Sequence, residues 1–150
     1  MIITISGTPA SGTTTASKQL TQSFEQNPPE RYDHENSSTV THINGGDVFR
    51  GMATENNMSL KEFSKHVNDN PDIDEEIDAT LSAAVRLFRN TRRDNQDKNP
   101  LPIDFNRAAD ILILESRLAG WIAGNRATVS YWLDAPLQVR KQRVEQTEDE

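Results

Sequence analysis

The chain has 150 residues, of which 23 are acidic and 16 are lysine or arginine, giving a formal net charge of −7 and a pI near 5.0. This charge argues against wrapping a nucleic-acid backbone, because that role requires a basic surface. The absence of cysteine excludes disulfides and sulfur-ligated metals, and no apolar run approaches membrane-spanning length.

Residues 2–6 form a short β-branched run that predicts a buried strand, and the run breaks at Gly7. Gly12 comes after four more residues, followed by three threonines and a helical pattern over residues 14–24. This is the layout of a phosphate-binding loop, G-x-x-x-x-G-K-[ST], except that Thr13 stands at the lysine position. Backbone N–H groups form the anion cradle, so most of it survives the substitution. The lost charge would lower affinity or rate by about one to two decades. The alternative is a strand–helix turn that binds no ligand.

Two stretches stand out for their polar composition. Residues 25–39 and residues 92–106 each contain two prolines, within sequences rich in Asn, Asp, Arg, Ser or Glu. Both patterns predict surface loop insertions, and we expect the first of them to have no role in function.

The middle of the chain predicts three helices. Residues 40–43 predict a second strand, and Asp47 is placed to cap the helix that follows it. Ser59 and Glu62 have the spacing of a capping box at the start of the next helix, and Asp72 starts a longer one. We expect these helices, about residues 47–90, to form a small subdomain over one edge of the sheet. The apolar positions expected to face inward are Leu60, Phe63, Ile73, Ile77, Leu81, Ala84 and Phe88.

The last third of the chain predicts two more strands. Residues 111–114 are the most apolar run and predict a central parallel strand, residues 128–133 predict a fourth strand, and a last helix follows Asp134. Four strands alternating with helices predict an α/β fold with a parallel sheet. In such a fold, ligands bind beyond the carboxyl ends of the strands. The segments there are Gly7–Thr15, Gly45–Arg50, Glu115–Arg117 and Asp134.

Three of these side chains suit phosphate chemistry directly. Thr14 stands at the Ser/Thr position whose hydroxyl completes a Mg²⁺ shell, although it could instead be a helix-capping threonine. Arg50 and Arg117 follow different strands and can converge on one anion, which a guanidinium grips with two hydrogen bonds. Either arginine alone could be a surface ion-pair partner.

Four more charged residues have two interpretations each. Glu115 and Asp134 could orient magnesium-bound water or pair with an arginine, or they could be helix caps and structural ion-pair partners. Arg140 and Arg143 could face the nucleotide, or they could only balance the acidic end of the chain. A loop for one phosphate group and arginines for another are what a kinase of small phosphorylated substrates requires.

At these residues the chain resembles a known family, the archaeal type of cytidylate kinase. The resemblance implies a P-loop kinase domain over residues 1–150 with a helical monophosphate-binding insertion, and transfer of the γ-phosphate of ATP to CMP or dCMP with Mg²⁺. The mild acidic excess is compatible with a haloarchaeal member. The segments that carry the resemblance, in order, are residues 2–15, 45–50, 58–63, 71–74, 114–121 and 132–137.

The same resemblance implies roles for individual residues. Arg50 and Arg117 would be catalytic, and together with Asp47 they would bind the monophosphate. Thr14 would bind the metal through its hydroxyl. Since some family members carry threonine at the loop lysine position, Thr13 is compatible with an active enzyme. The residues implied to bind ATP are Gly7, Thr8, Pro9, Ala10, Ser11, Gly12, Thr13, Thr14, Thr15, Arg140 and Arg143.

The family pattern continues through a lid with further arginines, a last strand and a C-terminal helix, whereas this sequence ends at Glu150. We therefore expect the lid and the final strand to be missing, with poor stability and little activity if the protein is a truncated form. We expect a cytoplasmic monomer that acts on small-molecule nucleotides, with neither nucleic acid nor a membrane as partner. The alternatives are another P-loop kinase, such as an adenylate kinase, and a non-catalytic nucleotide-binding module.

Overall fold

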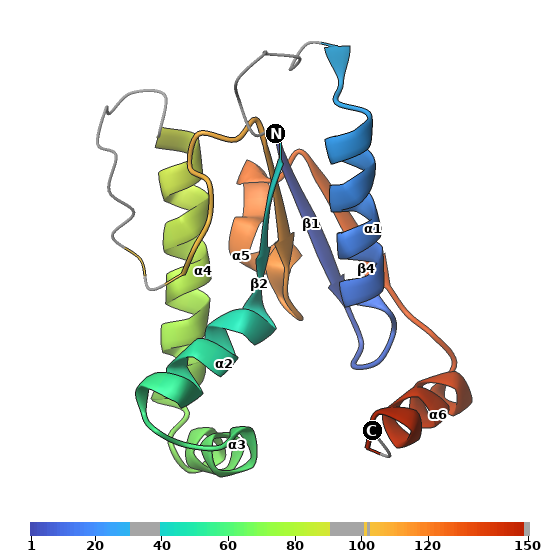
Figure 1. Ribbon diagram of the computed structural model, residues 1–150. Helices are drawn as coiled ribbons and strands as arrows, with labels where there is room; N and C mark the ends of the chain where they lie inside the picture. The colour runs from blue at the N-terminus through green and yellow to red at the C-terminus, as the bar shows by residue number, and fades with distance from the viewer. Residues whose placement is uncertain (31–39, 91–100, 102, 149–150) are drawn as a thin grey trace.

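The computed structural model describes residues 1–30, 40–90, 101 and 103–148 (Figure 1). Its centre is a parallel sheet with the strand order β2-β3-β1-β4. The predicted α/β fold and the central position of residues 111–114 are confirmed. The strands are β1 (Ile2–Gly7), β2 (Val40–Asn44), β3 (Ile111–Glu115) and β4 (Val129–Leu133).

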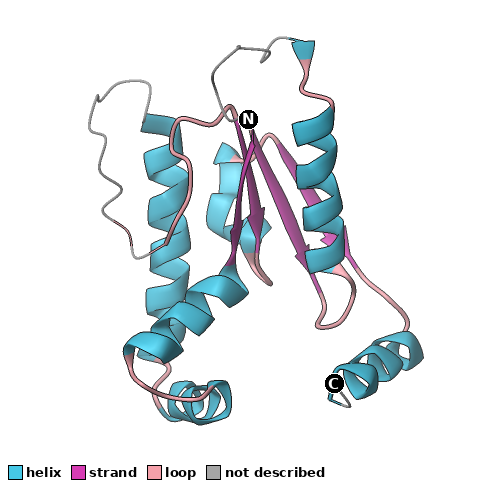
Figure 2. Ribbon diagram, in the orientation of Figure 1, coloured by secondary structure: helices cyan, strands magenta, loops and turns pink. Residues whose placement is uncertain are grey.

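Helices cover both faces of the sheet (Figure 2). Side chains alternate along a strand, so Leu112 and Leu114 of β3 pack on one face against α4 (Asp72–Asn90) and α5 (Ala119–Ala123). The opposite face packs against α1 (Thr13–Gln26). Every residue of β3 is buried, and each fully buried Leu or Ile contributes about 1.5–3 kcal/mol. The core therefore fixes the strands whose ends form the site.

Two short helices, α2 (Gly45–Glu55) and α3 (Leu60–Asp69), form a smaller cluster beside the carboxyl ends of the strands. Phe49 and Phe63 meet edge to face with their ring centroids 4.9 Å apart, a geometry that contributes about 0.5–1.5 kcal/mol beyond burial. The first half of α4 lies beside this cluster, while its second half belongs to the main core. Helix α4 thus packs against both the sheet and the cluster formed by α2 and α3.

Two of the predictions for these helices are wrong. Asn44, and not Asp47, caps α2, because its side chain accepts a hydrogen bond from the Gly46 N–H at 2.6 Å. Leu60 was expected to face inward but is 50% exposed, because only Phe63 and Val67 of α3 reach the cluster. The capping box of Ser59 and the apolar stripe of α4 are confirmed.

The two predicted loop insertions lie mainly outside the described residues, which exclude 31–39, 91–100 and 102. At their edges the prediction is wrong in two places. Helix α1 continues to Gln26, and Phe105 is buried in the main core. Phe105 is held there because the N–H of Asn106 donates to the Thr41 hydroxyl at 3.0 Å.

The end of the described chain is much more exposed than its start. A single 3-10 turn (Gly124–Arg126) leads from α5 into β4, and α6 (Leu137–Glu148) follows β4. Trp132 of β4 is 65% exposed, and Leu137 of α6 is 57% exposed. Within the described ranges, no helix has the length and apolar character needed to cross a membrane.

Candidate active site

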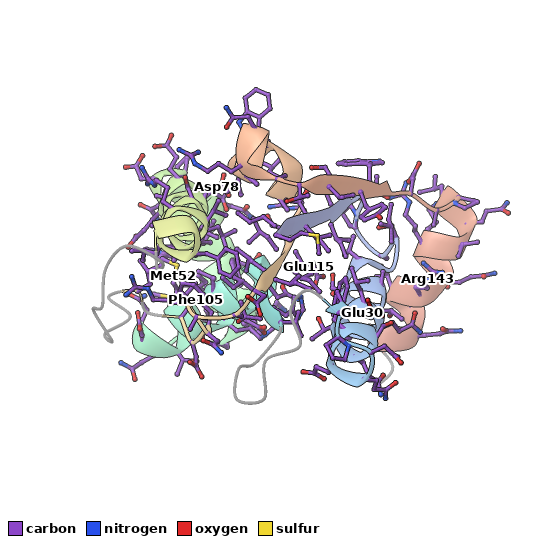
Figure 3. All side chains as sticks on the ribbon, turned by 90° about the horizontal axis from the view of Figure 1, so that it is seen from above. Glu30, Met52, Asp78, Phe105, Glu115 and Arg143 are labelled. Carbon is purple, nitrogen blue, oxygen red and sulfur yellow. The ribbon has the colours of Figure 1, made fainter. Side chains whose placement is uncertain are left out.

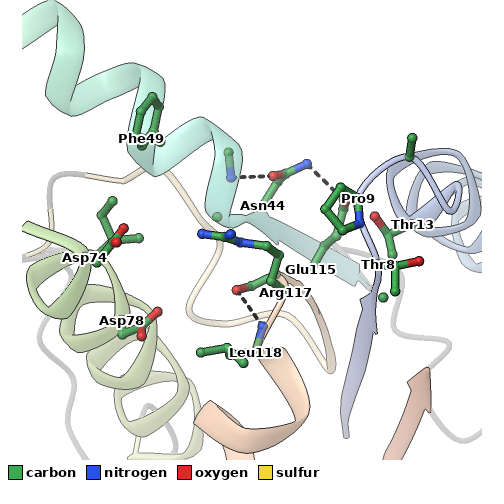
Figure 4. Close-up of a pocket in the computed structure, with 16 residues that line it drawn as sticks. Thr8, Pro9, Thr13, Asn44, Phe49, Asp74, Asp78, Glu115, Arg117 and Leu118 are labelled. Carbon is green, nitrogen blue, oxygen red and sulfur yellow. Dashed lines mark hydrogen bonds between the residues drawn. The ribbon is translucent and has the colours of Figure 1, made fainter. Parts of the chain in front are cut away.

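The carboxyl ends of the four strands meet at one edge of the sheet, where a cavity of about 580 Å³ opens. This volume lies within the range of about 300–1,000 Å³ that is typical of small-molecule sites. The loop after β1, the start of α2, the first half of α4 and the loop after β3 line it (Figure 4). The structure therefore brings together three of the four segments that the sequence placed at strand ends.

The loop between β1 and α1 has the backbone of an anion cradle. Gly12 and Ala10 have φ angles of +102° and +60°, and such left-handed residues let successive N–H groups converge. A Cβ atom at Gly7 would lie 2.4 Å from the Leu133 carbonyl oxygen and 2.6 Å from the Ser11 hydroxyl oxygen, so the tightly folded loop requires glycine there. The Ser11 hydroxyl is buried and has no hydrogen-bond partner in the described part of the chain. These features fit a loop that binds phosphate groups.

Asp134 fastens the loop to the end of β4. Its carboxylate accepts a hydrogen bond from the Thr8 hydroxyl at 2.8 Å and one from the Ala135 N–H at 2.9 Å. These two bonds lower the pKa of Asp134 below its usual range. The structure therefore gives Asp134 a role in holding the loop, which none of the interpretations made from the sequence included.

Glu115 lies at the bottom of the cavity and is only 4% exposed. One carboxylate oxygen accepts from the Thr14 hydroxyl at 2.6 Å, and the other accepts from Asn44 Nδ2 at 2.9 Å and His42 Nε2 at 3.1 Å. Burial raises the pKa of Glu115, but the hydrogen bonds from His42 and Thr14 outweigh it and hold the pKa below its usual value. Glu115 is therefore an ionised residue that links the ends of β2 and β3 to the first turn of α1.

His42 and Asn44 are functional residues that the sequence reasoning missed. They approach Glu115 because β2 pairs with β3 in a register that places Asn44 opposite Glu115. Strands are easier to predict from a sequence than the register between them, because the register depends on packing. The available signal was the polar character of His42 within the predicted strand and of Asn44 just after it.

Arg117 points toward two carboxylates of α4, on the side of the cavity away from Thr13 (Figure 4). Asp74 and Asp78 lie one turn apart on α4, and Ile77 lies beside them on the cavity wall (Figure 4). Burial and the Asp74 carboxylate raise the pKa of Asp78, while the positive charge of Arg117 lowers it in part. Neither aspartate was predicted as a site residue, because the sequence of α4 was interpreted only as a core-facing stripe. We call Arg117, Asp74 and Asp78 the acceptor wall, and residues 7–15 with Glu115 the loop wall.

Arg50 and Asp47 lie at the rim and do not line the cavity. Arg50 Nη2 donates to the Asp47 carboxylate, and both side chains are exposed to solvent. A Cβ atom on Gly46, which does line the cavity, would lie 3.4 Å from Arg50 Nη1. The Arg50 guanidinium is thus next to the cavity, and its predicted convergence with Arg117 on one anion stays a prediction.

A second cavity, of about 710 Å³, adjoins the loop and is lined by residues 10–16 together with Arg143 of α6. Arg143 Nη1 donates to the Ala10 carbonyl oxygen at 2.9 Å. Arg140 instead donates from Nε to the Ala135 carbonyl oxygen at 3.0 Å, within the turn that precedes α6. Of the two arginines predicted for the nucleotide, the structure places Arg143 on the loop.

The chemistry of the donor set fits a magnesium ion. Mg²⁺ prefers hard oxygen ligands and is usually held by one or two protein groups together with substrate phosphates. The Thr14 hydroxyl oxygen and the Glu115 carboxylate are such oxygens, and they lie in contact beside the phosphate-binding loop. Thr14 therefore stays the predicted metal residue, and Glu115 joins it.

Comparison with known proteins gives consistent matches. A family described as AAA domain matches residues 3–150. A cytidylate kinase of Halobacterium salinarum is 36% identical over 99% of this chain and 59% of its own length. The corresponding values for a cytidylate kinase of Pyrococcus horikoshii are 33%, 99% and 58%. For a cytidylate kinase of Methanococcus vannielii they are 35%, 100% and 67%. The chain thus spans about three fifths of the length of several of these relatives.

Proposed function

The chain belongs to the AAA-domain family and to the family of archaeal cytidylate kinases, and on this premise we propose that it transfers the γ-phosphate of ATP to CMP or dCMP. The observation that carries the proposal is the cavity in which a phosphate-binding loop faces Arg117. A kinase of phosphorylated substrates needs two phosphate sites opposite each other, and we infer that the loop and Arg117 are these two sites.

Phosphoryl transfer requires positioning and positive charge more than covalent chemistry. The N–H groups of the loop would bind the phosphates of ATP, as helix N-termini preceded by glycine turns do in general. Arg117 would bind the phosphate of the acceptor in two parallel hydrogen bonds. Because a phosphate monoester loses its second proton near pH 6, the acceptor is already nucleophilic at neutral pH and needs no general base.

Thr14 and Glu115 are the residues that would hold Mg²⁺, which neutralises charge on the transferring phosphate when it is bound. The hydrogen bonds that lower the pKa of Glu115 keep this carboxylate ionised at neutral pH. His42 and Asn44 fix its second oxygen, so their contribution is to orient the carboxylate beside the loop.

Asp74 and Asp78 support cytosine as the base of the acceptor. A carboxylate accepts hydrogen bonds from the exocyclic amine of cytosine, whereas uracil presents a carbonyl oxygen at the same position and would be repelled. Phe49 and Ile77 add apolar surface on the same side of the cavity, against which a base can pack.

The test is an assay of the purified chain with ATP, Mg²⁺ and each of CMP, dCMP, UMP and AMP, with nucleoside diphosphates separated by ion-exchange chromatography. We expect CDP and dCDP, and no product with the Gly7→Ala variant, which controls for contaminating kinases. Phosphorylation of AMP with CMP left unchanged would identify an adenylate kinase. ATP binding by calorimetry without any turnover would identify a non-catalytic nucleotide-binding module.

We also propose that the chain acts as a monomer on small-molecule nucleotides in the cytoplasm. Support for the monomer comes from the cavity, whose two walls are both provided by one chain. Light scattering after size-exclusion chromatography should give a mass near 16.8 kDa. Twice that mass, unchanged on dilution, would contradict the monomer.

A further inference from the structure

The loop wall carries a negative side-chain charge at the place where phosphates are expected to bind. Residues 7–15 contain neither lysine nor arginine, so the loop offers phosphates only the partial charges of its N–H groups. In the general pattern a lysine would stand at Thr13 and bring a full positive charge. Glu115 lines the same cavity and is only 4% exposed. The loop wall therefore has a formal side-chain charge of −1.

The charge of Glu115 is maintained by its surroundings. Burial raises the pKa of this carboxyl, but hydrogen bonds from His42, Thr14 and Thr13 outweigh burial and hold the pKa below its usual value. The residue at the lysine position thus lies beside an ionised carboxylate and does not neutralise it. Because the carboxylate is buried, its repulsion of another anion is stronger than it would be in water.

Two arginines lie near the loop wall, one on each side of it. Arg117 lines the first cavity but points toward the carboxylates of α4 (Figure 4). Arg143 lines the second cavity, and Figure 3 shows it on the opposite side of Glu115 from Asp78. Among the described residues, the side-chain charge that the first cavity places next to the loop is therefore that of Glu115.

We propose that the loop wall binds a nucleoside triphosphate only as its complex with a divalent cation, and that Glu115 and Thr13 together select this complex over the free nucleotide. A free triphosphate would bring several negative charges against a buried carboxylate, and the loop has no lysine to offset them. Toward the metal complex, Glu115 would instead be a ligand of the cation, so the same carboxylate favours binding. The inference rests on the proposed function, since it takes ATP as the ligand. It goes beyond that function because it concerns which form of the nucleotide can bind.

The test is calorimetry of ATP binding to the 150-residue chain, once with excess Mg²⁺ and once with EDTA. We expect Mg²⁺ to tighten ATP binding by more than about 100-fold in the wild-type chain. Glu115→Gln should bind ATP about 10- to 100-fold more tightly than wild type in EDTA and more weakly than wild type with Mg²⁺. This change of sign is the decisive result, because a carboxylate that only supported the loop would weaken ATP binding in both solutions when it is removed.

Thr13→Lys tests the second residue without removing the carboxylate. The added ammonium should tighten ATP binding in EDTA by about 10- to 100-fold, because it offsets the charge of Glu115. Thr13→Ser keeps the hydroxyl and should retain the wild-type values in both solutions. Exposed positions on α1 provide the charge controls, since Glu25→Gln and Gln22→Lys change the net charge of the chain by the same amounts outside the cavity. Both controls should leave the effect of Mg²⁺ unchanged.

Two results would overturn the inference while leaving the proposed function intact. One is a wild-type chain that phosphorylates CMP with Mg²⁺ but binds ATP equally well in EDTA. The other is a Glu115→Gln variant that loses the same affinity in both solutions, together with a Thr13→Lys variant that gains none in EDTA. The predicted metal dependence without any CDP formation would overturn the proposed function alone. A folded wild-type chain that fails to bind ATP with Mg²⁺ would overturn both, and circular dichroism with thermal melts identifies variants that misfold.

Discussion

The two walls of the cavity differ in how their charged side chains are held. On the loop wall, Glu115 accepts hydrogen bonds from three side chains, and neighbouring Thr8 is tied to Asp134. On the acceptor wall, Arg117, Asp74 and Asp78 form no side-chain hydrogen bond or ion pair within the described residues, and two like charges lie one helical turn apart. Such a pair is unfavourable by a few tenths of a kcal/mol. The polar side chains of the loop wall thus hold one another in place, whereas the acceptor wall leaves its charges available for a ligand.

The strongest disruption should come from the loop wall, at Gly7. In Gly7→Ala the new Cβ would collide with the Leu133 carbonyl oxygen and the Ser11 hydroxyl, so the loop must open. We expect ATP affinity to fall by more than about 100-fold, with a loss of about 1–3 kcal/mol in unfolding free energy. Calorimetry and urea denaturation measure the two effects.

Gly51→Ala is the matched control for this variant. Gly51 lies within α2, and a Cβ atom there would have no neighbour within 4 Å. Alanine should therefore raise the free energy of unfolding by up to about 1 kcal/mol and leave ATP affinity unchanged. If Gly7→Ala behaved like Gly51→Ala, the loop would not be the tightly folded cradle described above.

On the acceptor wall, Arg117→Ala should separate the two substrates. Loss of a bidentate guanidinium should raise the KM for CMP by about 10- to 100-fold, since charge-assisted hydrogen bonds contribute roughly 1.5–3 kcal/mol. The Kd for ATP should change less than threefold, because the loop wall keeps its own contacts. Steady-state kinetics and calorimetry give the two values, with exposed Arg126→Ala as the control. An equal loss of both affinities would indicate a structural arginine.

The loop wall and the acceptor wall also differ in how much of each could be predicted from the sequence. Local patterns were enough to predict the loop, the buried strand 111–114 and the position of Arg117 just after that strand. Glycine spacing and apolar runs are properties of one segment and can be recognised without the rest of the fold. The partners of Glu115 were not predicted, because they depend on the register that sets Asn44 opposite it. Asp74 and Asp78 were missed for a related reason. Only the assembled fold shows that α4 also has a face that lines the cavity and is turned toward Arg117.

The helix cap of α2 was predicted wrongly for the same physical reason. The segment from Asn44 to Asp47 contains two residues that both favour capping positions. The choice of Asn44 follows from where β2 ends, since its side chain both accepts from Gly46 and donates to Glu115. These two hydrogen bonds of Asn44 could not be predicted without knowing how β2 pairs with β3.

Glu115→Gln should reveal how much of the loop wall depends on charge. Because the folded pKa of Glu115 is lowered, its stabilising contribution is present above its usual pKa of 4.5 and is lost as pH falls through the folded value. Replacing the carboxylate with an amide should cost about 1–3 kcal/mol at pH 7, as hydrogen bonds to a buried charge are lost. Urea denaturation from pH 7 to pH 3 should show the difference from wild type shrinking toward acid. Glu145→Gln, on exposed α6, should show no such dependence, and a difference independent of pH would contradict the assignment.

The smallest effect is expected at Asp78, where Asp78→Asn should act in opposite directions on stability and on catalysis. The raised pKa means that ionised Asp78 opposes folding, so its favourable contribution is present below the usual pKa and is lost as pH rises through the folded value. The amide should therefore stabilise the chain at pH 7 by about 0.2–0.5 kcal/mol, a gain that vanishes in acid. It should also raise the KM for CMP by about 2- to 10-fold relative to that for UMP, because an acceptor for the cytosine amine is lost. A variant that is more stable but keeps its preference for CMP would show that Asp78 faces the cavity without reading the base, and Asp74 would then be the carboxylate to test.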